Sequence, residues 1–298
     1  MIMDTVEVNL VDTLRNQKFI SLLLLALLVT YVLPFPFMTN FFHDYSRVKE
    51  LRDDMIKEHN AIVCHRVLET DPDFFSSQGM KCNDKYYRPD EETVSTGELL
   101  VYADTYGKYL EAKRELRRDL PGLKVFAILV FLLSLWFGYS LIDLTVKVSS
   151  GYEGGLLGPL LAGLHSLPAL VASEALVFAA MFVLLTVFAV PIALFGPVGV
   201  LVAGFIVSPA FTLVIPAYYF ARRVFPIGEI WRVARGNPGG YLSLGLGLSV
   251  VEILTVVAMG YTLSIGLGVL FLVILAAGAL HYLLGSLGSL WVYLGHSP

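Results

Sequence analysis

The stretch FISLLLLALLVTYVLPFPFM, residues 19–38, contains no charged side chain. A helix needs about 20 mostly apolar residues to cross about 30 Å of hydrocarbon, so this stretch predicts a membrane-spanning helix. It is longer than the apolar part of a signal peptide, and it ends in Pro and Phe instead of a small-residue cleavage site. We therefore expect the chain to keep it as a first span.

Further apolar segments follow, and the composition of the whole chain agrees with them. The chain is 56% hydrophobic and 15% charged with a mean hydropathy of +0.70, whereas soluble domains are about one quarter charged. The sequence predicts an all-α, polytopic membrane protein with about six transmembrane helices. The other five spans are expected at about 122–143, 168–190, 193–220, 241–261 and 264–291.

One polar insert interrupts this framework between the first and second spans. It holds 30 of the 46 charged residues, all of them between Asp44 and Asp119. Apolar residues recur at helical spacing near each end of the insert, and a turn-rich stretch lies between them. We expect residues 39–121 to form a helical hairpin whose charge runs are solvated faces.

The boundaries of the second hairpin helix have sequence signals of their own. Ser95 followed by Glu98 has the spacing of a capping box and predicts that the helix begins there. Pro121 and Gly122 are expected to end it at the membrane surface, because proline removes a backbone donor.

Cys64 and Cys82 are the two cysteines of the chain, and both lie in the insert. A disulfide between them would persist in an extracytoplasmic compartment. The alternatives are two unpaired thiols, or a metal site formed by Cys64 and His65. We expect the disulfide.

The loops indicate an orientation, because arginine and lysine are enriched in cytoplasmic loops. The connection 221–240 carries four arginines, whereas the expected turns near Pro191 and Gly260 carry no Lys or Arg. A multi-pass protein of the cell membrane follows, with both termini and the loops 146–167 and 221–240 in the cytoplasm and the insert outside. The four interfacial arginines are Arg222, Arg223, Arg232 and Arg235.

Catalytic and cofactor motifs are missing from the sequence. It contains no phosphate-binding G-x-x-x-x-G-K-[ST] loop and no H-E-x-x-H, C-x-x-C or G-x-S-x-G motif, so we expect a non-catalytic chain with no cofactor or metal. The net charge is −4, and the insert holds 13 basic and 17 acidic residues. Nucleic acid is therefore not an expected partner.

Two ionisable residues lie inside the expected spans. Glu252 is near the middle of 241–261, and His281 is inside 264–291. Such groups are costly at membrane depth and normally face a cavity or a partner. Either could line a translocation path or a proton relay, or each could make one interhelical hydrogen bond.

The N-terminal residues 1–18 resemble the start of a known family. Val6, Leu10 and Leu14 share one helical face, and Arg15 and Lys18 precede the first span. This pattern is similar to the interfacial elbow helix of ABC-2 type transporter permeases.

A second resemblance to that family lies between the second and third spans. Many of its members have an acidic-Gly-Thr-Leu stretch followed by a leucine pair, which Glu153-Gly154-Gly155-Leu156 and Leu160-Leu161 resemble. In the family this region docks on the ATPase. The resemblance implies a permease subunit that forms a homo- or heterodimer, works with a separate ATP-binding subunit, and moves a lipid, drug or polymer.

Two other functions are compatible with the sequence. The protein could be a membrane scaffold or sensor whose outer helical hairpin binds a partner. It could also be a secondary transporter that uses Glu252 and His281, although the six spans show no internal repeat of the kind those transporters have.

Overall fold

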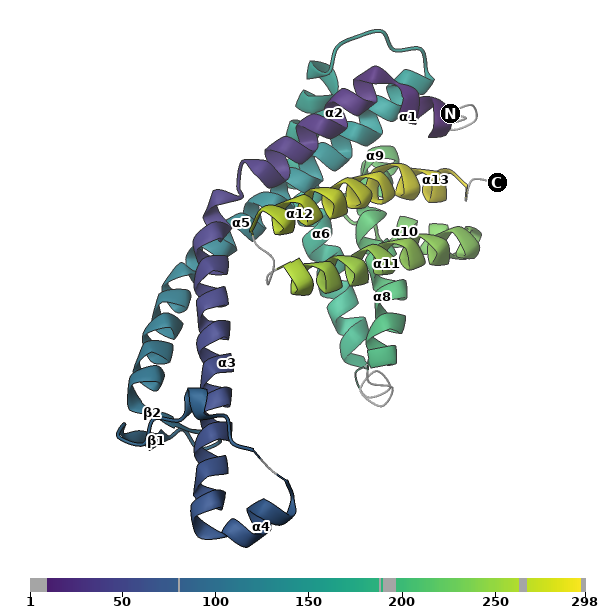
Figure 1. Ribbon diagram of the computed structural model, residues 1–298. Helices are drawn as coiled ribbons and strands as arrows, with labels where there is room; N and C mark the ends of the chain where they lie inside the picture. The colour runs from purple at the N-terminus through teal and green to yellow at the C-terminus, as the bar shows by residue number, and fades with distance from the viewer. Residues whose placement is uncertain (1–9, 80, 188, 190–196, 263–266, 296–298) are drawn as a thin grey trace. The chain divides into compact units, whose positions relative to one another are not determined.

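The computed structural model describes residues 10–79, 81–187, 189, 197–262 and 267–295 (Figure 1). The chain divides into two compact units. Residues 1–35 and 127–298 form the first, which we call the membrane unit. Residues 36–126 form the second, which we call the hairpin unit.

The membrane unit is built from helices, several of them long and apolar (Figure 1). Its N-terminal elements are α1 (Leu10–Arg15), α2 (Gln17–Leu27) and the π-helical η2 (Leu28–Val32). The C-terminal part of α5 (Ala103–Ser149) and α6 (Leu157–Val187) come next. The remaining elements are α8 (Pro197–Thr212), α9 (Val214–Ala221), α10 (Ile227–Gly236), α11 (Pro238–Thr262), α12 (Leu267–Tyr282), the π-helical η4 (Leu283–Gly288) and α13 (Ser289–Leu294).

The expected fold class is confirmed at this level. In the described part of the chain, five helices are long and apolar enough to cross a membrane, or six if Gln17–Val32 and the helix after it form one broken span. Large apolar side chains such as Leu24, Phe178, Val256 and Leu272 are exposed on these helices. That exposure suits contact with lipid, so the chain has the architecture of a polytopic membrane protein.

Two predicted boundaries in the membrane unit are wrong. The first span does not run unbroken over 19–38, because the helix ends at Val32 and the next begins at Pro36, with Pro34 between them. The segment 146–167 is not a loop, because α5 continues to Ser149 and α6 begins at Leu157. The connection is therefore only residues 150–156. Pro168 lies inside α6, where its missing donor does not end the helix.

Three clusters of buried side chains hold the membrane unit together. One joins α6, α8–α11 and α13, one joins α2 to α5 and the C-terminal helices, and one joins α5 to α6, α9 and α13. Gly245 of α11 lies against the carbonyl oxygen of Phe205 in α8, with no room for a side chain. Thr30 of η2 and Tyr282 of α12 share a buried hydrogen bond of 2.6 Å.

The hairpin unit contains α3 (Pro36–Thr70), α4 (Pro72–Ser77), the 3-10 turn η3 (Asp84–Tyr86), two strands and the first part of α5 (Figure 1). The strands β1 (Thr93–Ser95) and β2 (Leu100–Tyr102) are antiparallel, and Thr93 lies opposite Tyr102. Gly97 has φ +93° in the turn between them. A helical hairpin is therefore present, with a small β-hairpin at the start of its second helix.

Both predicted boundaries of that second helix are wrong. The helix begins at Ala103 and not near Ser95, because Ser95 belongs to β1 and Glu98 lies in the β-turn. Thr96 closes this turn, since its side-chain oxygen accepts a hydrogen bond from the Leu99 backbone N–H at 3.2 Å. At the other end, α5 runs through Pro121. Gly122 allows the carbonyl of Phe37 to approach closely there, because a β-carbon would lie 2.6 Å from that oxygen.

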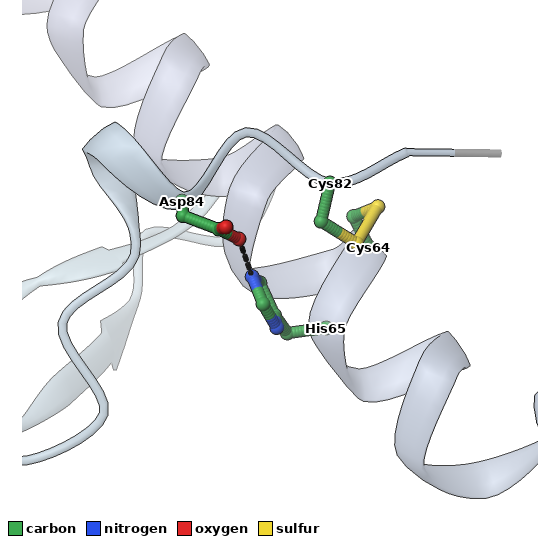
Figure 2. The surroundings of a disulfide bond; sticks show 4 residues. All are labelled: Cys64, His65, Cys82 and Asp84. Carbon is green, nitrogen blue, oxygen red and sulfur yellow. Dashed lines mark hydrogen bonds and ion pairs between the residues drawn. A yellow bond between two sulfur atoms is a disulfide. The ribbon is translucent and has the colours of Figure 1, made fainter.

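The expected disulfide is present in the hairpin unit. Cys64 of α3 is bonded to Cys82, and their Cα atoms are 5.6 Å apart (Figure 2). Next to it, His65 Nε2 lies 3.0 Å from an Asp84 oxygen, and the His65 ring stacks on Tyr87 with ring centroids 3.7 Å apart. Both cysteines are therefore unable to act as free thiols or metal ligands.

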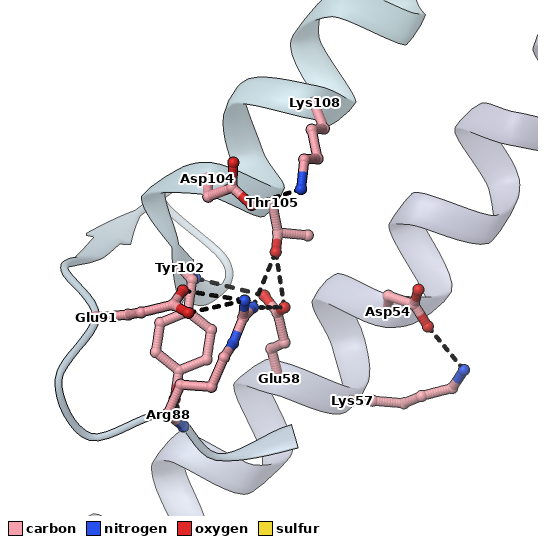
Figure 3. Close-up of polar contacts among 9 residues, drawn as sticks. All are labelled: Asp54, Lys57, Glu58, Arg88, Glu91, Tyr102, Asp104, Thr105 and Lys108. Atoms are coloured by element: carbon pink, nitrogen blue, oxygen red, sulfur yellow. Dashed lines mark hydrogen bonds and ion pairs between the residues drawn. The ribbon is translucent and has the colours of Figure 1, made fainter. Parts of the chain in front are cut away.

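A buried carboxylate forms the polar centre of the hairpin unit (Figure 3). Glu58 of α3 is 5% exposed and accepts hydrogen bonds from Arg88, from the Thr105 hydroxyl at 2.7 Å and from the Tyr102 backbone N–H at 3.4 Å. Arg88 also lies over the Tyr102 ring, 4.3 Å from its centroid. One acid thus fixes α3, β2 and the start of α5.

An exposed ion pair occupies the turn of α3 that leads directly into Glu58 (Figure 3). Lys57 Nζ donates a hydrogen bond to Asp54 at 2.9 Å. This bond is the main reason why the pKa of Lys57 lies above its ordinary value. Lys57 therefore stays charged where the hairpin unit meets solvent.

Candidate functional site: a polar cavity among the membrane helices

A cavity of about 290 Å³ lies among the helices of the membrane unit, and three ionisable side chains line it. They are Glu174 of α6, Glu252 of α11 and His281 of α12. The structure thus brings together the two residues that the sequence left unpaired, and adds a third. The rest of the lining is Phe131, Ser134, Leu135, Gly138, Ser208, Phe211, Thr212, Ile215, Leu248, Tyr282, Gly285 and Ser286.

Glu174 and Glu252 lie far from the ends of their helices, and His281, in the last turn of α12, lies in an apolar stretch that continues through η4 and α13. Glu174 is central in α6 (Leu157–Val187), Glu252 is central in α11 (Pro238–Thr262), and His281 is central in the apolar stretch Gly268–Leu294. Residues at such positions lie deep in the hydrocarbon when the helices span a bilayer. The cavity is therefore a polar site at membrane depth.

Glu174 is the most deeply placed of the three. Its exposed fraction is 8%, and among the described residues no side chain or backbone group forms a hydrogen bond or ion pair with its carboxyl. Glu252 is exposed, and its one hydrogen bond in the described residues is a long one of 3.5 Å from Ser208. His281 is exposed as well. The buried end of the cavity is thus an acid without a partner.

Glu174 is also the residue that the sequence analysis missed. It lies within the expected third span 168–190, so the rule that drew attention to Glu252 and His281 applies equally to it. Its signal was an acid inside an apolar run, in ASEAL.

The cavity wall combines apolar and hydroxyl groups. Phe131, Phe211 and Tyr282 supply aromatic surface, while Ser134 and Ser286 supply hydroxyls. Gly285 and Ser286 come from the π-helical η4, a type of segment that is rare and often occurs at functional sites. A small, mostly apolar ligand with one polar group is the kind of molecule that such a wall can hold.

The four predicted arginines lie at or near α10, in the connection between α9 and α11. Arg222 ends α9 in the left-handed region at φ 53° and donates a hydrogen bond to the Tyr139 hydroxyl at 2.7 Å. Arg232 pairs with Glu229 at 2.8 Å, and Arg235 lies over the ring of Trp231. Arg223 is exposed. This connection contains the short helix α10, and the buried face of α10 includes Ile230 and Val233.

The residues that resemble the ATPase-docking region of ABC-2 permeases, 153–156 and 160–161, divide into two groups. Leu156 and Leu160 pack against the cluster that joins α2 to α5, and the backbone carbonyl of Glu153 accepts a hydrogen bond from Lys18 Nζ at 2.9 Å. Gly154 is half-buried and Gly155 exposed. Leu161 is exposed, and so are Leu157 and Leu164 on the same helix. The first turns of α6 therefore present an apolar face to the surroundings.

Several hydrogen bonds tie the connecting segments to the helices of the membrane unit. Lys18 holds the 150–156 connection to the start of α2, and Asn237 donates to the Val292 carbonyl at 3.3 Å, which joins the start of α11 to α13. Ser173 of α6 donates to the Val224 carbonyl at 2.8 Å. The arginine-rich connection is thus held against α6 through Ser173, and the 150–156 connection against the start of α2 through Lys18.

No protein-family model matches the chain, and no curated protein or solved structure matches it.

Proposed function

We propose that the protein is the membrane-embedded permease of a transport system and that the cavity lined by Glu174, Glu252 and His281 is its substrate site. The observation that supports this most directly is the unpaired acid at membrane depth. A carboxyl group there is costly and is retained mainly on substrate or ion pathways. Transporters commonly bind their substrates near the middle of the bilayer, between helices with irregular segments.

We further propose that the energy comes from a separate ATP-binding subunit, as in an ABC-type transporter. The support is the resemblance of residues 153–161 to the docking region of ABC-2 permeases and the exposed Leu157, Leu161 and Leu164 beside it. The sequence has no phosphate-binding loop, so ATP hydrolysis would belong to the partner chain. Such a permease would work as a homo- or heterodimer.

The same proposal assigns the sides of the membrane. The end that contains Arg222, Arg223, Arg232 and Arg235 would be cytoplasmic, together with both termini. The hairpin unit would be outside the cytoplasm, where its Cys64–Cys82 bond persists.

Affinity purification of the full chain from its native membranes tests the ATPase. We expect a nucleotide-binding subunit to be recovered in stoichiometric amount. Leu161→Glu should lower that recovery at least about tenfold, since it places a charge in the apolar contact. Leu120→Glu is the matched control, because Leu120 is a similarly exposed leucine of the hairpin unit and should leave recovery unchanged. A lone homo-oligomer without an ATPase would refute the ABC-type mechanism.

A second candidate function is partner recruitment by the hairpin unit. It is favoured by the interactions that stabilise that unit, which has its own disulfide and an ion pair between the buried Glu58 and the partly exposed Arg88. A chain lacking residues 41–119 should then insert into the membrane and lose its partner. Unchanged recruitment by that shortened chain would rule the function out.

A further inference from the structure

We infer that the cavity binds a compact organic cation that carries apolar or aromatic groups. The inference rests on the proposed function, because it names the substrate class of the same site. It depends on three features of the wall: an unpaired acid at its buried end, the charge of its other members, and its aromatic surface.

The first feature is Glu174. The side chain is 8% exposed and lines the cavity, and within the described residues it has neither a hydrogen bond nor an ion pair. A carboxylate in such surroundings is strongly disfavoured unless a cation neutralises it. No such cation comes from the wall, because the residues described as lining the cavity include neither Lys nor Arg. A ligand cation would therefore meet a buried carboxyl group for which no Lys or Arg of the described lining competes.

The second feature is the placement of Glu252 and His281. Both side chains are exposed, whereas Glu174 is buried. Two acids and no Lys or Arg are among the described residues that line the cavity, so its charge favours a cationic ligand. Ser208 donates a long hydrogen bond of 3.5 Å to Glu252.

The third feature is the size and surface of the cavity. Its volume is about 290 Å³, roughly ten times the share of one water molecule in the liquid. It is too large for one bare ion, and no three described His, Cys, Asp or Glu side chains converge as metal ligands would. Phe131, Phe211 and Tyr282 can instead surround an organic cation through their ring faces.

Benzyltrimethylammonium and neopentylbenzene are the probes for this inference. They have the same shape, because one has a quaternary nitrogen where the other has a carbon, and they differ by one positive charge. The full chain is purified into nanodiscs of uncharged phosphatidylcholine, and equilibrium binding of each probe is measured. We expect saturable binding of the cation at least about tenfold tighter than that of the neutral isostere.

The variant Glu174→Gln should lose at least about tenfold in affinity for the cation and keep its affinity for the neutral isostere. Glu252→Gln should reduce the affinity for the cation less than Glu174→Gln does, because Glu252 is exposed. Glu50→Gln is the matched control, since it removes an exposed acid of α3 outside the cavity and should change nothing. The comparison of the two probes on the unaltered chain needs no variant and holds even where Glu174→Gln folds poorly.

Equal affinity of the unaltered chain for the two probes would overturn the inference, and so would full cation affinity in Glu174→Gln. Neither result depends on an ATPase. If an ATPase copurifies with the chain but the chain binds the two probes equally, the permease proposal stands and only the inference of a cationic ligand is rejected. If the chain binds the cation more tightly than the neutral probe but no ATPase copurifies, the cation site is supported and the ABC-type mechanism is rejected.

Discussion

Replacement of Arg88 by Met should loosen the β-hairpin of the hairpin unit. Arg88 compensates the buried charge of Glu58, whose carboxylate keeps only the Thr105 hydroxyl at 2.7 Å and the distant Tyr102 N–H at 3.4 Å when the guanidinium is gone. Removal of one partner from a buried ion pair costs about 3–5 kcal/mol. The Arg88 side chain is 37% exposed, so solvent already screens part of its charge. We therefore expect a loss of about 2 kcal/mol.

Hydrogen exchange of the full chain, followed by mass spectrometry, measures this loss locally. The backbone N–H groups of Tyr102 and Leu100 bond to Glu58 and to His59 Nδ1, so they report on the attachment of β2 to α3. A loss of about 2 kcal/mol corresponds to exchange about 30-fold faster. Peptides that cover β2 should show it, and peptides from the membrane unit should not.

Two further variants make the prediction sharp. Glu58→Gln combined with Arg88→Met should restore most of the protection, because the double variant leaves no buried charge without a partner. Lys108→Met is the matched control, since the Lys108–Asp104 pair has 58% exposure on both sides and should change exchange less than about twofold. The reasoning is refuted if Arg88→Met stays within about twofold of the unaltered chain, or if the double variant exchanges as fast as the single one.

Three other predictions follow from the described contacts. Gly245→Ala should lower thermal stability in detergent by about 1–3 kcal/mol through overpacking, whereas Gly268→Ala, which has open space, should not; equal melting temperatures would argue against close packing of α11 on α8. Replacement of Cys64 and Cys82 by Ser should destabilise the hairpin unit by about 3 kcal/mol for a sequence separation of 18 residues, measured by hydrogen exchange; unaltered protection would contradict it. In that cysteine-free chain, Glu98→Cys should react with an impermeant maleimide on intact cells, and failure to react would reverse the proposed orientation.

The spans could be predicted from the sequence because each depends on a local property, the length of an apolar run. The wrong boundaries have a local cause too. Pro121 was expected to end the second hairpin helix, and the third span was expected to begin near residue 168, yet α5 runs through Pro121 and α6 through Pro168. Ser95 and Glu98 have capping-box spacing, but Gly97 between them favours the turn of a β-hairpin.

The cavity could not be predicted, because it depends on which helix faces pack together. Glu252 and His281 are recognisable alone as ionisable residues in spans. Their common cavity with Glu174 exists only through the packing of α6, α11 and α12, and no spacing along the chain contains that information. The disulfide was easier, since two cysteines in one polar insert allow one pairing.

The unpaired Glu174 also bears on how the protein is made. The chain is synthesised from the N-terminus, so α6 would enter the membrane before α11 and α12 exist to complete the cavity. A charged residue at the centre of a helix raises the free energy of insertion by about 2.5–3.5 kcal/mol, and each Leu, Phe or Val returns about 0.3–0.6 kcal/mol. Phe178, Phe182 and Val183 of α6 are all more than 60% exposed. Together they return about 0.9–1.8 kcal/mol and so offset part of the cost of inserting the acid before the helices that enclose it are made.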